Sequence, residues 1–147
     1  MTHILFVCTG NTCRSPMAEA ILKSKQIPGM KVRSAGVYAM DGSQASENTK
    51  KVLDENDLMH DHQSSVLSPA LVDWATYIFT MTGSHKSAVI SMFPYAREKV
   101  FTIKEFAENN QTTDIMDPFG RSVDVYRDTY RELESTINQL LDKLRED

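Results

Sequence analysis

The sequence predicts an α/β fold: a single three-layer domain with a central four-stranded parallel sheet and helices on both faces. Apolar runs rich in β-branched and aromatic residues alternate with amphipathic segments, which is typical of a parallel sheet with crossover helices. The 147 residues fit one domain, spanning residues 1–147, and no linker or repeat divides them. Hydrophobic residues make up 41% of the chain and charged residues 24%, which indicates a folded protein.

Four short segments are predicted as the strands of the sheet. They lie at residues 4–7, 32–35, 77–81 and 99–102, and Gly36 ends the second. The runs at 4–7 and 77–81 show no polar alternation, which is typical of strands buried on both faces. A sheet built from such strands binds ligands where its strands end, so the loop after the first strand is the natural place for a site.

The segments between the strands predict the helices. Ser15 is expected to cap the first helix, with Pro16 as its first helical residue and Glu19 in its first turn. Further helices are expected at residues 47–56, from 68 to 74, and at 83–92. A polar loop at 109–113 then leads to Asp117. The clearest helix is the last, where apolar residues recur at three- and four-residue spacing: Tyr126, Tyr130, Leu133, Ile137, Leu140 and Leu144.

Composition excludes several classes of function. The net charge is −4 and there is no run of basic residues, which argues against a nucleic-acid partner. The longest apolar runs are too short to span a bilayer, and the first residues lack the basic and apolar regions of a secretory signal. We therefore expect a cytoplasmic protein with no membrane partner.

The two cysteines, Cys8 and Cys13, indicate chemistry rather than a structural disulfide. They lie in one short loop, where a disulfide bond would close little chain and stabilise little. The alternative for Cys8 is that it is only a small buried residue at the end of a strand.

The loop from Cys8 to Ser15 predicts a binding site for a tetrahedral oxyanion. Gly10 and Asn11 both tolerate the left-handed backbone region, so successive N–H groups can turn inward as an anion-binding nest. The following helix adds the positive end of its dipole, and Arg14 adds a planar fork of donors. The predicted phosphate-binding residues are Thr9, Gly10, Asn11, Thr12, Cys13, Arg14 and Ser15.

Cys8 is the predicted nucleophile. A helix N-terminus and a nearby cation lower a cysteine pKa from about 8.5, and a hydrogen bond from Ser15 would support the thiolate. In-line attack on phosphorus would give a cysteinyl-phosphate, which water then hydrolyses. Asp117, held extended by Pro118, is the predicted general acid, although an Asp–Pro pair is more commonly just a turn opener.

No metal or cofactor is expected. The histidines His3, His60, His62 and His85 show no metal-ligand spacing with the cysteines, and we interpret them as surface or packing residues. The glycine and lysine pattern of a nucleoside-triphosphate loop is absent as well.

The motif Cys-x-Gly-Asn-x-Cys-Arg-Ser-Pro at residues 8–16, with Asp117–Pro118 before the last helix, resembles the low-molecular-weight protein tyrosine phosphatases. The resemblance covers essentially the whole chain. It implies that Cys8 is the nucleophile, Arg14 the phosphate clamp, Ser15 the partner of the thiolate and Asp117 the general acid. It also implies that Asn11 shapes the loop and that residues 34–36 pack beneath it.

Two positions make the bacterial protein arginine phosphatases the most similar branch. Phosphotyrosine enzymes of this family usually carry an aliphatic residue at position 12, whereas this chain has Thr12, whose hydroxyl can order a polar contact beside a P–N bond. Phe119 is followed by Gly120, so one aromatic wall is present where many relatives have two. The resemblance therefore implies phosphoarginine in proteins as substrate, with phosphotyrosine as the alternative.

Other readings of the same loop remain open or are excluded. Thioredoxin-coupled arsenate reductases have a similar loop, but they need further cysteines downstream, and none follows Cys13. A non-catalytic module that binds phosphorylated partners is the alternative to an enzyme. Cys13 is a candidate redox residue that would form a reversible disulfide with an oxidised Cys8, unless it only packs under the loop. A monomer is expected, because one chain completes the loop.

Overall fold

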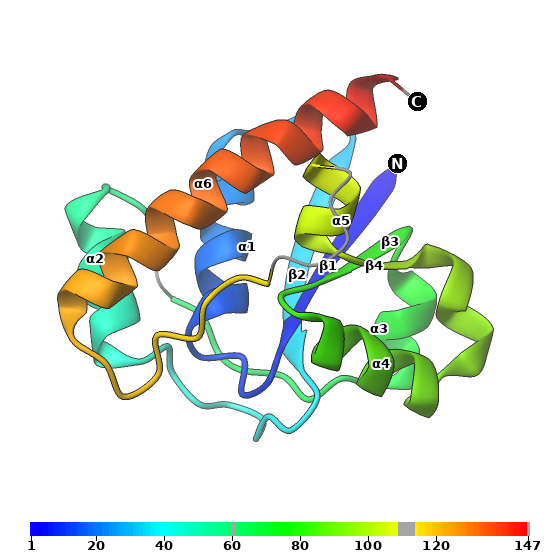
Figure 1. Cartoon of the computed structure of the whole chain (residues 1–147), viewed down its shortest axis with the longest axis horizontal. Helices are drawn as coiled ribbons and strands as arrows, with labels where there is room; N and C mark the ends of the chain where they lie inside the picture. Colours follow the sequence, from blue (N-terminus) through cyan, green and yellow to red (C-terminus); the bar gives the residue numbers. More distant parts are fainter. Residues whose placement is uncertain (60, 109–113, 147) are drawn as a thin grey trace.

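The computed structural model describes residues 1–59, 61–108 and 114–146 and confirms the predicted α/β fold (Figure 1). Its parallel sheet has the strand order β2-β1-β3-β4. The strands are β1 (Thr2–Cys8), β2 (Met30–Gly36), β3 (Tyr77–Thr80) and β4 (Val100–Thr102). Each contains or closely overlaps one of the four predicted runs. The polar loop predicted at 109–113 lies outside the described residues.

Helices cover both faces of this sheet. They are α1 (Arg14–Ser24), α2 (Glu47–Glu55), α3 (Pro69–Trp74), α4 (Gly83–Met92), the 3₁₀ helix η1 (Pro94–Lys99), α5 (Ile103–Glu108) and α6 (Val123–Glu146). Figure 1 shows α1, α2 and α6 on one side of the sheet and α3 and α4 on the other. The helices η1 and α5 were not predicted from the sequence. No described helix has both the length and the apolar character needed to cross a membrane.

The central strand β1 is buried on both faces, as its apolar run predicts. Ile4 and Phe6 pack into the core beneath α1 and α6, whereas Leu5 and Val7 pack into the core beneath α3 and α4. All four side chains are fully buried. Successive side chains of a strand point to opposite faces, so these four residues hold β1 rigidly from both sides. Cys8, the last residue of β1, therefore stands on a fixed support.

The strand order places one loop at the point where the sheet topology reverses. From β1 the chain crosses to β2 on one side, and the next strand, β3, lies on the other side of β1. Ligands of open parallel sheets bind at such a point, outside the carboxyl ends of the strands. The loop after β1 and the start of α4, which follows β3, meet at this edge.

Helix α6 confirms the predicted amphipathic pattern. Five of its six predicted apolar residues are buried, from Tyr126 to Leu140, and Leu144 is partly buried. The helix packs against α1, α2 and α5. It follows directly on the segment that carries Asp117, so its packing on α1 brings that segment near the start of α1.

Candidate active site

The Cys8 loop (residues 8–15) connects β1 to α1 and is shaped by one left-handed residue, Asn11, whose φ is 58°. Gly10, which also tolerates this region, does not adopt a positive φ. Asn11 can adopt this conformation because its side chain forms compensating hydrogen bonds. Its Nδ2 donates to the hydroxyls of Ser15 and Ser34, at 2.8 and 2.9 Å, and its Oδ1 accepts the backbone N–H of Ser65 at 2.9 Å.

A second layer of polar residues supports Asn11 from behind. His62 donates from Nε2 to the Asn11 carbonyl oxygen at 2.7 Å, and its Nδ1 lies 3.6 Å from Glu19 Oε1. Burial raises the pKa of Glu19, but hydrogen bonds from His62, Lys23 and Ser34 outweigh it and lower the pKa to about 2. Glu19 is therefore ionised at neutral pH. The sequence did not predict that His62 contacts the loop, because residues 51 positions apart show no relation in local spacing. His60 lies outside the described residues.

Gly36, at the end of β2, allows the loop to approach the sheet closely. A Cβ atom at this position would lie 2.4 Å from the Thr9 carbonyl oxygen and 2.9 Å from the Asn11 nitrogen. Any side chain here would displace the loop backbone. Ser34 and Gly36 thus lie directly beneath the loop, where the family resemblance led us to expect them.

Cys8 lies with its sulfur 2.8 Å from the Ser15 hydroxyl and is 3% exposed. Burial raises the pKa of the Cys8 thiol, while the hydrogen bonds of Ser15 and the charge of Arg14 act to lower it. The sequence predicted a lowered pKa from the cation and the helix N-terminus. That prediction is wrong for the thiol in this structure, because desolvation disfavours the thiolate more than these groups favour it.

Ser15 is therefore expected to carry much of the remaining support for the thiolate. Replacing Ser15 by Ala removes a donor to the charged form, so the pKa of Cys8 should rise further. The pH profile of Cys8 alkylation by iodoacetamide should shift to higher pH in Ser15→Ala. Cys13→Ala in the same assay is the control for alkylation at the second cysteine. An unchanged midpoint in Ser15→Ala would show that the hydroxyl does not stabilise the thiolate.

The first helix begins two residues earlier than its sequence predicts, at Arg14 rather than Pro16. Arg14 is its first residue, and Cys13, at the N-cap position, provides no side-chain cap. The prediction that Ser15 caps this helix is wrong, because its hydroxyl contacts Cys8 and Asn11 instead. A helix start without a side-chain cap keeps its N–H groups for another acceptor. Such a start favours an anion over the Cys8 loop.

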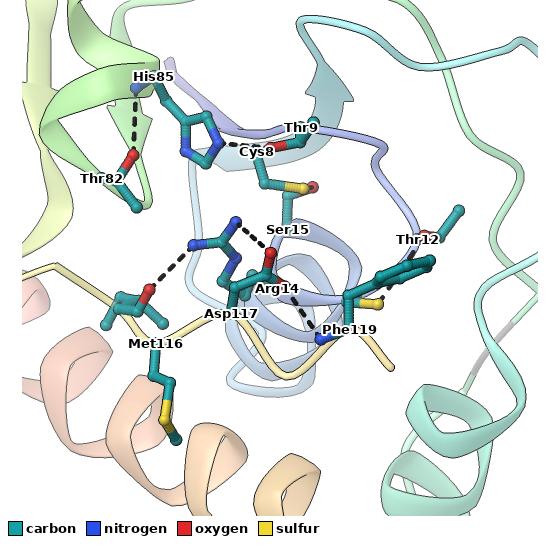
Figure 2. Close-up of polar contacts among 12 residues, drawn as sticks. Cys8, Thr9, Thr12, Arg14, Ser15, Thr82, His85, Met116, Asp117 and Phe119 are labelled. Atoms are coloured by element: carbon teal, nitrogen blue, oxygen red, sulfur yellow. Dashed lines mark hydrogen bonds and ion pairs between the residues drawn. The ribbon is translucent and has the colours of Figure 1, made fainter. Parts of the chain in front are cut away.

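Arg14 and Asp117 face one another across the site (Figure 2). Arg14 is 5% exposed, and its Nη1 donates to the Ile115 carbonyl oxygen at 2.9 Å. Its Nη2 lies 3.6 Å from Asp117 Oδ2, while Asp117 Oδ1 accepts the N–H of Phe119 at 3.0 Å. The Asp117 carboxylate is about half exposed. A buried cation thus stands beside an accessible acid.

A pocket of about 270 Å³ opens above the sulfur of Cys8. Its lining contains most of the predicted site residues: Cys8, Thr9, Gly10, Thr12, Cys13, Arg14, Asp117 and Phe119. The other two, Asn11 and Ser15, are fully buried and bond to the loop from within. Phe119 stands 71% exposed at the rim. Residues separated by more than 100 positions therefore form one pocket.

Both cysteines are free thiols in this structure. The sulfur of Cys13 lies 3.4 Å from the Tyr126 hydroxyl and 3.5 Å from the Ser46 hydroxyl. Its redox role stays a prediction. Among the described residues, no three His, Cys, Asp or Glu side chains are placed together to hold a metal ion.

Comparison with known proteins identifies the family. Residues 3–147 match the sequence model of the low molecular weight phosphotyrosine protein phosphatases. The chain belongs to this family. Within it, the chain is 50% identical to a protein-arginine-phosphatase of Geobacillus stearothermophilus, over 97% of this chain and 96% of that protein. It is 43% identical to the protein-arginine-phosphatase of Bacillus subtilis (strain 168), over 98% and 97%.

One similar solved structure bears on the site. It is a mutant of the YwlE arginine phosphatase with a phosphorylated active-site serine. It matches this chain with a TM-score of 0.95 and 42% identity, over 99% of this chain and 97% of that chain. Its fold is thus the fold described above.

Proposed function

We propose that this protein is a cysteine-dependent phosphoprotein phosphatase that hydrolyses phosphoarginine in proteins through a cysteinyl-phosphate intermediate. Two full-length relatives bear the name protein-arginine-phosphatase, and the pocket combines a buried thiol, a buried guanidinium and an accessible carboxylate. These are a nucleophile, an anion clamp and a proton donor within one small cavity.

In the first step Cys8 attacks phosphorus in its thiolate form, which the hydrogen bonds of Ser15 and the charge of Arg14 favour, and the bond from phosphorus to the guanidinium nitrogen breaks. The N–H groups of the Cys8 loop and Arg14 hold the phosphoryl oxygens, where charge develops. Asp117 donates a proton to the leaving nitrogen, so the arginine side chain leaves as its ordinary guanidinium cation. The products of this step are cysteinyl-phosphate and a free arginine side chain.

In the second step water attacks the phosphorus of the cysteinyl-phosphate. The Asp117 carboxylate, now without its proton, takes a proton from that water. The P–S bond breaks, Cys8 leaves as a thiolate that the Ser15 hydroxyl stabilises, and inorganic phosphate is released. Each residue thereby returns to its initial state.

The wall formed by Thr12 carries the preference for phosphoarginine. Thr12 lines the pocket together with a single aromatic side chain, Phe119. A hydroxyl at this wall can satisfy the polar hydrogens of a guanidinium, which an aliphatic wall would leave unpaired. The runner-up substrate is phosphotyrosine, which the description of the whole family favours.

Specificity constants for matched peptides test the substrate. We expect kcat/KM to be higher for a phosphoarginine peptide than for the phosphotyrosine peptide of the same sequence, with Cys8→Ser as blank. A preference for phosphotyrosine would keep the mechanism and overturn the substrate. Activity on neither peptide, with tight binding of both, would favour the phosphate-binding module.

Thr12→Ile is expected to shift the preference toward phosphotyrosine. The change adds apolar surface and removes the hydroxyl, so the ratio of the two specificity constants should change by about 10- to 100-fold. Thr12→Ser, which keeps the hydroxyl, is the matched control and should keep the wild-type preference. If the ratio is the same in Thr12→Ile and wild type, position 12 does not select the substrate.

A further inference from the structure

A histidine from a different part of the chain touches the Cys8 loop beside the nucleophile. His85 lies in the first turn of α4, and its Nε2 is 2.8 Å from the hydroxyl of Thr9 (Figure 2). The helix start is fixed by Thr82, whose hydroxyl accepts the N–H of His85 at 3.1 Å. His85 is 6% exposed, whereas Thr9 lines the active-site pocket. The mechanism above gives His85 no role.

His85 is a neutral imidazole at neutral pH. Burial and the positive charge of Arg14 lower the pKa of His85 to about 4, although the carboxylates of Asp117 and Asp114 oppose this shift. A neutral imidazole has one N–H, carried by either ring nitrogen. The position of that proton decides what His85 offers to Thr9.

The surroundings of the ring favour the proton on Nε2. The other nitrogen, Nδ1, is buried and has no hydrogen-bond partner among the described residues. A proton on Nδ1 would be a buried donor without an acceptor, which is rare and costly. A proton on Nε2 instead reaches the Thr9 hydroxyl oxygen at 2.8 Å. His85 therefore donates, and Thr9 accepts.

This arrangement leaves the hydroxyl proton of Thr9 for another acceptor. A hydroxyl is one donor as well as an acceptor, and the oxygen of Thr9 already accepts from His85. The backbone of Thr9 is held separately, because its carbonyl oxygen accepts the N–H of Tyr38 at 3.0 Å. His85 thus acts on the direction of the hydroxyl rather than on the path of the chain.

We propose that the Thr9 hydroxyl donates a hydrogen bond to the oxyanion bound over Cys8, and that His85 is the positioning residue that orients this hydroxyl. The proposal rests on the proposed function only for the place where the phosphoryl group binds. It adds one side-chain donor to the N–H groups and the guanidinium. Packing does not account for His85, since an apolar side chain would fill the same space without an unpartnered buried nitrogen.

Equilibrium binding of inorganic phosphate tests this, by titration calorimetry on wild type, Thr9→Val, His85→Leu and the double variant. We expect each single change to weaken binding by about tenfold, because a hydrogen bond to a charged ligand is lost or misdirected. The double variant should bind no more weakly than the weaker single variant, since both changes remove one interaction. Thr9→Ser, which retains the hydroxyl, should stay within about twofold of wild type.

Several results would overturn the proposal. One is phosphate affinity in His85→Leu equal to wild type; another is losses that multiply in the double variant. A third is Thr9→Val binding as tightly as Thr9→Ser, a comparison that stays valid even if His85→Leu does not fold. Thermal melting distinguishes a role of His85 in stability from its role in phosphate binding. We expect the melting temperature of His85→Leu to be close to that of wild type, because the change also removes the unpartnered nitrogen.

The binding readout keeps this proposal apart from the proposed function. Phosphate binding that follows the expected pattern, in a protein that hydrolyses neither peptide, would contradict the proposed phosphatase activity and support the proposed role of Thr9 and His85. Hydrolysis of phosphoarginine with phosphate affinity unaffected by Thr9→Val would support the phosphatase activity and contradict the proposed role of Thr9 and His85.

Discussion

Cys8→Ser should abolish turnover while the protein still binds phosphate. A serine hydroxyl is far harder to ionise than a thiol, and the buried site of Cys8 raises the cost of any negative charge there. We expect kcat on the preferred peptide to fall by roughly 10⁴-fold or more. Arg14 and the loop N–H groups do not depend on the sulfur, so phosphate affinity measured by calorimetry should remain.

The same variant also reports on the intermediate. In a relative of this family, a mutant carries a phosphorylated serine in its active site. In this chain, Cys8→Ser incubated with a phosphoarginine peptide should slowly gain one phosphoryl group and keep it, because an alkoxide leaves less readily than a thiolate. Intact-mass measurement detects the gain, and Cys8→Ala is the control that cannot form the ester. Full turnover in Cys8→Ser would exclude Cys8 as nucleophile.

The central strands β1 and β3 could be predicted because they are buried on both faces. Such strands appear as continuous apolar runs, which is why the run at 4–7 located β1 (Thr2–Cys8) without any other information. Helix α5 was missed although a signal existed. The hydroxyl of Thr102 accepts the N–H of Glu105, and the Glu105 carboxylate accepts the N–H of Thr102, which is a capping box. A six-residue helix offers too little periodicity to support that signal.

The candidate site was predictable only as far as it is local. The eight residues from Cys8 to Ser15 are contiguous, so their spacing alone indicates an anion-binding loop. Contacts made across the fold are not visible in this way: His62 and His85 reach the loop from 51 and 76 residues away. Desolvation of Cys8 likewise depends on everything packed around it, which explains the wrong direction predicted for its pKa.

The neutral substitution Asp117→Asn should slow catalysis by about 10²- to 10⁴-fold, the usual loss when a general acid is removed. Asparagine keeps an oxygen that can accept the N–H of Phe119, as Asp117 Oδ1 does at 3.0 Å, so the segment beside Arg14 should hold its shape. The half-exposed side chain makes a large loss of stability unexpected. The loss should therefore appear in kcat rather than in the melting temperature.

Leaving groups of different basicity identify what Asp117 supplies. If it donates a proton to the leaving atom, kcat/KM of Asp117→Asn should fall least for an aryl phosphate with a weakly basic leaving group and most for phosphoarginine. Asp117→Ala, which also removes the acceptor for Phe119, is the comparison that reveals any contribution from the shape of the segment. Equal losses across all leaving groups would assign Asp117 to holding Arg14 rather than to proton transfer, because Asp117 Oδ2 lies 3.6 Å from Arg14 Nη2.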